Sequence, residues 1–349
     1  MKMLLVGGTF DEYGGKHSKI IEEMGSQLEC LTINGGYLEH LNKLNFKEWD
    51  ILIWMPNISN DAEKILPTTK HPLTGNYKLL LVSSKNARDR DYQYSDFIGR
   101  MLKTKSNLGI YIEEFKGHMG SKLQFSLFDP LGNRYAKTFD IAELCHYLKH
   151  RIKLLRSLTR IGSECIAEGE GIEIEKGFIE VIRNSSEQFS KFVNANNPNR
   201  LLGNASTRCA SGFPAIRKDN KIFVTRRNVD KVTLSSDDFV EVKLIDNKVK
   251  YYGSQKPSVD TAIQIKLFDY YPNINYMIHG HVYIKDAFKT RSKIPCGYIE
   301  EFNEITDLFP DKNTKELFVN LKGHGCLIAS DTIEKLKQAI FIGRDFPET

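Results

Sequence analysis

Short apolar runs recur through about the first 115 residues, and this rhythm constrains the fold more than any other feature of the chain. Each run ends at Gly, Asn, Pro or Ser, as buried strands do; the runs are 2–6, 28–33, 50–54, 78–82 and 108–112. Helical segments at 17–26 and 92–104 fit between several of them. This alternation predicts an open, mainly parallel α/β sheet.

The pattern changes after this region. Residues 122–138 hold two strand-like runs around a Pro-Leu-Gly-Asn turn, which indicates a hairpin. Apolar residues then recur at helical spacing to about residue 160, which predicts one long helix. Because 349 residues exceed the usual size of one domain, we place a boundary there. The predicted domains are 1–160 and 161–349.

The second half mixes helices and strands without βαβ alternation. Helices are expected near 175–194 and 258–271, and the strand at 274–278 runs directly into His279. This mixture predicts a layered α+β domain.

Bulk properties exclude several classes of partner. The net charge of +5 arises from Lys and Arg scattered among nearly as many Asp and Glu, whereas a nucleic-acid footprint needs clustered charge. No run approaches the roughly 18 apolar residues of a membrane span. The six cysteines form no C-x-x-C pair, which argues against a disulfide framework. We therefore expect a cytoplasmic protein with reduced thiols and neither nucleic-acid nor membrane partners.

A glycine-rich segment follows the first predicted strand, and its notable residues are Gly7, Gly8, Thr9, Gly14, Gly15 and Ser18. Such a loop can present backbone N–H groups to a phosphate, although a tight turn with Ser18 as helix cap explains it nearly as well. The sheet loosely resembles Rossmann-like or flavodoxin-like domains, including nucleoside deoxyribosyltransferases. That resemblance implies nucleotide or sugar-phosphate binding, or even nucleoside chemistry, in this domain.

The sharpest local signal is His279-Gly280-His281. Residues i and i+2 of a strand share one face, so the two imidazoles can chelate one ion, while Gly280 leaves room for close approach. His324, also flanked by glycines, offers a third ligand. Three imidazoles with one open position form a catalytic type of metal site; the alternative is core or surface histidines.

Six blocks occur in a fixed order: Gly-Asn-Ala-Ser-Thr-Arg at 203–208, Ile-Phe-Val-Thr-Arg-Arg-Asn-Val-Asp at 222–230, Leu-Ser-Ser-Asp-Asp-Phe-Val at 234–240, Lys-Pro-Ser-Val-Asp-Thr at 256–261, Ile-His-Gly-His at 278–281 and Lys-Gly-His-Gly at 322–325. In order and spacing, roughly residues 175–340 resemble the class II aldolase/adducin family. Its members include fuculose-phosphate aldolases, ribulose-phosphate epimerases and methylthioribulose-phosphate dehydratases.

The resemblance implies a metal-dependent enzyme. It suggests His279, His281 and His324 as ligands of a divalent ion, usually zinc in the family, that stabilises an enediolate. We expect an aldolase-type lyase acting on a sugar-phosphate-like anion, with an epimerase, a dehydratase or a non-catalytic adducin-like scaffold as alternatives. A homotetramer is expected by resemblance alone.

Several positions depart from the family pattern. The family's catalytic Glu is Asp260 here, one methylene shorter, and its phosphate-binding Ser-Gly is Arg227-Asn228. Arg227 could bind an anion or be an exposed turn residue. Asn204 and Ser258 match family anion-site positions, with turn or cap chemistry as the alternative. The hydroxyls of Tyr283 and Tyr298 could donate protons near the metal, although tyrosine is also common in cores.

Overall fold

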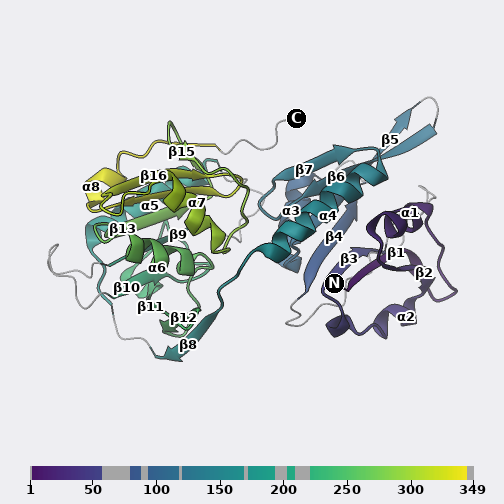
Figure 1. Ribbon diagram of the computed structural model, residues 1–349, viewed down its shortest axis with the longest axis horizontal. Coiled ribbons are helices and arrows are strands. Elements are labelled where there is room, and N and C mark those ends of the chain that lie inside the picture. The colour runs from purple at the N-terminus through teal and green to yellow at the C-terminus, as the bar shows by residue number, and fades with distance from the viewer. Residues whose placement is uncertain are drawn as a thin grey trace. The chain divides into compact units, whose positions relative to one another are not determined.

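The computed structural model describes residues 2–56, 79–87, 93–117, 120–168, 172–192, 203–208 and 221–343. The chain divides into two compact units, of which the first ends at Ser157 and the second begins at Leu158. Each unit is built on one large sheet with helices packed against it (Figure 1). The described helices lack the length and continuous apolar character that crossing a bilayer requires.

The first unit contains a seven-stranded sheet in the order β2-β1-β3-β4-β5-β6-β7. Its strands are β1 (Met3–Asp11), β2 (Leu31–Tyr37), β3 (Ile51–Met55), β4 (Leu80–Asn86), β5 (Leu108–Gly117), β6 (Gly120–Phe128) and β7 (Arg134–Thr138). Its helices are α1 (Lys19–Leu28), α2 (Leu38–Asn42), α3 (Tyr94–Thr104) and α4 (Ile141–Ser157). Strands β1 to β5 pair in parallel, and β6 and β7 continue the sheet antiparallel. The predicted parallel sheet and the hairpin are both confirmed.

Several strand boundaries differ from the sequence prediction, and β2, for example, continues past residue 33 through Gly35 and Gly36. β1 continues beyond residue 6 through Gly7, Gly8 and Thr9, and Leu28 ends α1 instead of beginning β2. The sequence analysis placed strand ends at glycines. In the structure, glycines of β1 and β2 instead let the two strands approach closely, because a Cβ on Gly8 would lie 2.7 Å from the amide nitrogen of Gly35. Residues 78, 92, 193 and 194 of the predicted segments lie outside the described residues.

The second unit contains a nine-stranded sheet in the order β15-β16-β17-β13-β9-β10-β11-β12-β8. These strands are β8 (Ser163–Ala167), β9 (Asn204–Thr207), β10 (Ile222–Thr225), β11 (Phe239–Ile245), β12 (Lys248–Tyr252), β13 (Tyr276–Gly280), β15 (Phe288–Lys289), β16 (Glu316–Leu321) and β17 (Gly325–Ser330). All neighbours from β16 to β12 pair antiparallel. A separate pair joins β14 (Tyr283–Ile284) to β18 (Phe341–Ile342).

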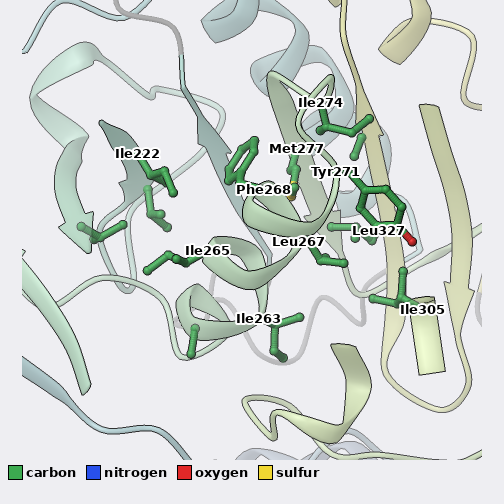
Figure 2. Close-up of a cluster of buried hydrophobic side chains, with 14 of the residues drawn as sticks. Ile222, Ile263, Ile265, Leu267, Phe268, Tyr271, Ile274, Met277, Ile305 and Leu327 are labelled. Carbon is green, nitrogen blue, oxygen red and sulfur yellow. The ribbon is translucent and has the colours of Figure 1, made fainter. Parts of the chain in front are cut away.

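Helices cover both faces of this sheet. Its helices are α5 (Lys176–Ser190), α6 (Thr261–Tyr270), α7 (Glu300–Leu308) and α8 (Ile333–Leu336). Along β13, Tyr276 and Ile278 pack in one core with α5 and α8, whereas Met277 packs in the other core with α6 and α7. Figure 2 shows Phe268 and Tyr271 of the second core beside Met277 and Leu327 of the sheet. The three layers confirm the predicted mixed α/β architecture of this half.

Candidate metal centre

Strand pairing positions the first histidine. His279 of β13 lies between Asn204 of β9 and Leu327 of β17 in the register of the sheet. Since side chains alternate along a strand, His279 shares the face of Met277, which α6 and α7 cover. Gly280 is required next to it, because a Cβ there would lie 2.6 Å from the ring of Phe189.

The other two histidines come from chain segments that border β13. His281 follows the end of β13, and His324 lies in the turn between β16 and β17. A Cβ on Gly325 would collide with the carbonyl oxygen of Gly280, so glycine lets this turn approach β13 closely. The turn is also held by the N–H of Gly323, which donates to the Tyr283 hydroxyl at 2.9 Å.

The structure brings the three predicted histidines together. Their ring centroids are 5.0 Å apart for His279 and His281, 4.6 Å for His279 and His324, and 5.1 Å for His281 and His324. One nitrogen of each ring lies within 4.8 Å of the others, and exposure is 3%, 8% and 0% in sequence order. Three converging buried imidazoles are a donor set that suits zinc.

His279 is oriented by its second nitrogen. Nδ1 lies 2.7 Å from the carbonyl oxygen of Cys326, which fixes the tautomer with the proton on Nδ1. Nε2 has no hydrogen-bond partner among the described residues and lies 3.9 Å from Oδ2 of Asp260. Burial, and then the charge on His324, lower the pKa of His279 to about 4. The ring is therefore neutral at pH 7, the form that binds a metal.

His324 is held by a buried carboxylate that the sequence analysis missed. Nδ1 lies 2.8 Å from Oε1 of Glu301, at the start of α7, and Glu301 is only 3% exposed. Burial by itself lowers the pKa of His324, but the Glu301 carboxylate and the Cys296 side chain together outweigh it and raise that pKa well above its ordinary value. This carboxylate–histidine pair orients Nε2 as the nitrogen for a metal, as in many zinc sites.

Asp260 lies at the start of α6 and faces the histidines. Its Oδ2 accepts a hydrogen bond from Nδ2 of Asn204 at 3.0 Å, and Asn204 Nδ2 is also 3.0 Å from the Ser258 hydroxyl. Gln264 donates to Oδ1 of Asn204 from the next turn of α6. Burial raises the pKa of Asp260, but the charge on His324, together with hydrogen bonds from Cys296 and the backbone of Gly297, helps to outweigh this, and the pKa is held below its usual value. An ionised carboxylate thus stands beside the imidazoles.

Cys296 joins the same centre. Its Sγ donates to Oδ1 of Asp260 at 3.1 Å, and Asp260, Cys296 and His324 form a second group with ligand atoms within 4.8 Å of one another. Burial and the neighbouring Asp260 raise the pKa of the Cys296 thiol to about 11. Of this segment, the sequence analysis proposed a role for Tyr298 only, and the Cys296 thiol was not among the predicted site residues.

The predicted anion-binding residues fall into two groups. Asn204 and Ser258 lie in the network that holds Asp260. Arg227 and Asn228 lie in an exposed turn after β10, where Asn228 adopts a left-handed conformation with φ of 61°. Asparagine tolerates this region better than most residues, which is consistent with its standing where the family has glycine. The preceding Arg226 is committed to Asp238 at 2.7 Å.

The two tyrosines have structural contacts. The Tyr283 hydroxyl accepts from the backbone of the His324 turn, and Lys289 Nζ lies 4.7 Å from the centre of its ring. Tyr298 is 7% exposed, and the guanidinium of Arg160 lies 4.9 Å above its ring. Tyr283 thus supports the site through the turn, and proton donation by either hydroxyl stays a prediction.

In the first unit, the glycine-rich segment is closed by hydrogen bonds within itself and to β2. The N–H groups of Thr9 and Gly15 donate to carbonyls of Lys16 and Gly36, and Lys16 N–H donates to the Thr9 hydroxyl. Ser18 is the N-cap of α1, but its N–H donates to Asn34 and its side chain makes no cap bond. These glycines, including Gly14 with φ of 91°, therefore have a structural reason.

Comparisons with known proteins concern the second half. Residues 189–296 match the family model described as Class II Aldolase and Adducin N-terminal domain. An L-fuculose 1-phosphate aldolase is 12% identical with a TM-score of 0.34, over 48% of this chain and 84% of that chain. YgbL of Klebsiella pneumoniae, described as an aldolase/epimerase/decarboxylase, is 13% identical with a TM-score of 0.31, over 46% and 83%.

The L-fuculose-1-phosphate aldolase of Thermus thermophilus is 15% identical with a TM-score of 0.30, over 45% of this chain and 81% of that chain. No curated protein matches the chain. The range of the family model includes Asn204, Asp260, His279 and His281, which meet at the centre described above. The C-terminal half of this chain contains a class II aldolase domain.

Proposed function

We propose that the C-terminal domain is a divalent-metal lyase that cleaves a carbon–carbon bond in a small, sugar-phosphate-like anion. The observation that carries this proposal is the convergence of His279, His281 and His324 with their ligand nitrogens within 4.8 Å. When bound, a zinc ion there supplies a Lewis acid that polarises a carbonyl or hydroxyl of the substrate.

Asp260 is the proposed base. Cleavage of a β-hydroxycarbonyl compound removes a hydroxyl proton, and the proton acceptor must be ionised and close to the reacting group. Asp260 is 6% exposed, and a nearby hydrogen bond from Asn204 supports its charged form. Asn204 of β9 donates to the Asp260 carboxylate, and Gln264 of α6 donates to Asn204. These hydrogen bonds limit the motion of the carboxylate.

Substrate recognition falls to the surrounding polar residues. We assign Ser258 and Asn204 to the buried end of the substrate and Arg227 with Asn228 to an exposed phosphate or carboxylate. Arg227 is exposed, and its guanidinium can bind two oxygens at once. Proton donation by Tyr283 or Tyr298 to the leaving group, and assembly into a tetramer, belong to the same proposal.

An epimerase is the second candidate. One metal site and one carboxylate base also suffice to deprotonate carbon next to a carbonyl, so the same arrangement supports both reactions. The products separate them, because cleavage yields two smaller carbonyl compounds while epimerisation preserves the mass.

We propose that the N-terminal unit binds a ligand at the edge of its sheet where flavodoxin-like sheets bind theirs. Its strand order begins 2-1-3-4-5, and in open α/β sheets of this order ligands lie beyond the carboxyl ends of the strands beside the switch point, here β1 and β3. The ligand would be a nucleotide or sugar phosphate. Thermal unfolding of the full chain with and without nucleotides tests this assignment.

Metal content and turnover test the main proposal together. Full-length protein purified without chelator should contain about one zinc per chain, and the double variant His279→Ala/His281→Ala should contain almost none. His146→Ala/His150→Ala, on the exposed surface of α4, is the matched control and should retain the metal. Wild-type protein without bound metal, or equal turnover of sugar phosphates by the double variant, would contradict the proposal.

A further inference from the structure

Two groups of metal-binding side chains meet at one residue. The first consists of His279, His281 and His324, and the second consists of Asp260, Cys296 and His324. Nδ1 of His324 is occupied by Glu301 at 2.8 Å, so a single nitrogen serves both groups. Because one imidazole nitrogen binds one ion at a time, we treat the two groups as one centre with five potential donors.

The position of Cys296 is fixed by its own segment. The guanidinium of Arg160 donates to the Cys296 carbonyl at 3.2 Å. The next residue, Gly297, has φ of 81°, and a Cβ there would lie 3.2 Å from Val259, which precedes the N-cap of α6. These contacts press the turn against α6 and hold Sγ 3.1 Å from Oδ1 of Asp260. The thiol is thus built into the centre.

A buried, unsatisfied nitrogen points to the same place. Nε2 of His279 has no hydrogen-bond partner among the described residues, although His279 is only 3% exposed. This Nε2 lies 3.9 Å from Oδ2 of Asp260, and the other carboxylate oxygen of Asp260, Oδ1, accepts a hydrogen bond from Cys296 Sγ. A cation bound by Nε2 of His279 would satisfy this nitrogen.

We propose that Cys296 is a ligand of the metal ion, bound through its thiolate together with the three histidines. This inference rests on the proposed function only in needing the histidine site. As the sulfur–metal bond forms, the Sγ–H proton passes to solvent, and no electron is transferred. Thiolates favour zinc and cobalt over magnesium and calcium, so Cys296 directs the choice of metal.

This arrangement separates two roles. Asp260 accepts one hydrogen bond from Asn204 through Oδ2 and stays available as a proton acceptor, while the sulfur completes the ligand set. Zinc can expand from four to five ligands, so a substrate oxygen can still enter the centre.

The experiment uses the full chain loaded with cobalt(II), whose spectrum reports its ligands. Wild-type protein should show visible ligand-field bands and, in the near ultraviolet, a thiolate-to-cobalt charge-transfer band. Cys296→Val, which keeps a side chain of similar size without a donor, and Cys296→Ser, which keeps a hydrogen-bond donor to Asp260, should both lose the charge-transfer band. Their cobalt affinity should fall at least roughly 10-fold, because losing a direct ligand costs no less than losing a group that only orients a ligand.

Cys165→Ser is the matched control, because Cys165 is an exposed thiol on β8 of the same unit. It should keep both sets of bands. If cobalt binds through the histidines without a charge-transfer band, or if the band persists in Cys296→Val, the role of Cys296 is overturned while the proposed function stands. If cobalt does not bind at all, or if binding survives His279→Ala/His281→Ala, the metal centre itself is overturned.

Discussion

The buried contact between Glu301 and His324 gives the most direct test of how the fold prepares a metal ligand. Glu301 Oε1 is 2.8 Å from His324 Nδ1, and both side chains are at most 5% exposed. With the proton on Nδ1, Nε2 is left for the metal. Glu301→Ala removes the group that selects this tautomer and holds the ring.

The expected loss can be estimated from similar contacts. Removing the hydrogen-bonded partner of a ligating histidine costs roughly 10- to 100-fold in metal affinity. At about 1.4 kcal/mol per tenfold change, this corresponds to about 1.4 to 2.8 kcal/mol of binding free energy. Glu301→Gln retains an oxygen that can accept from Nδ1–H, so it should lose less than Glu301→Ala.

Zinc affinity is measured by competition with a chromophoric chelator at constant pH. Asp307→Asn is the control, because it removes one negative charge from an exposed position of the same helix, α7. The control should match wild type. An affinity of Glu301→Ala within about twofold of wild type, alongside a large loss in His324→Ala, would refute the assigned role of the carboxylate.

Three further predictions concern stability. Burial lowers the pKa of Lys231 from 10.5 to about 8. Between pH 8 and 10.5 the unfolded chain therefore binds more protons than the folded chain. The free energy of unfolding should rise with pH across this window by up to about 3 kcal/mol. Lys231→Met should remove this rise, measured by denaturant unfolding across that pH window, and an unchanged pH profile would contradict the reasoning. Gly280→Ala should destabilise the domain by about 1 to 3 kcal/mol, because the new Cβ clashes with Phe189. Gly162→Ala is the control and should not destabilise it, because no atom lies within 4 Å of the new Cβ. Equal thermal stabilities of the two variants would argue against this packing. Phe268→Ala should lower the free energy of unfolding by about 3 to 5 kcal/mol, because the Phe268 ring is fully buried. Phe288→Ala should change it by less than about 0.5 kcal/mol, because Phe288 is 64% exposed. Similar losses in the two variants would be inconsistent with the described core.

Local patterns in the sequence determined the classes of elements. The alternating apolar runs and helices predicted the parallel part of the first sheet, because strand and helix periodicity depend on neighbouring residues. The same patterns placed strand ends wrongly at Gly7 and near Gly35, since a glycine marks a turn or a close approach equally well. Only the packed chain distinguishes the two.

The sequence also determined the three histidines, whose spacing and glycine neighbours are visible in the chain itself. What surrounds them was decided by tertiary structure. Antiparallel pairing of β9 with β13 sets Asn204 beside His279, and α7 brings Glu301 to His324. Cys296 reaches Asp260 through a turn pressed against α6. These contacts join residues distant in sequence, and no local periodicity encodes them, because they are fixed only when the helices pack on the sheet.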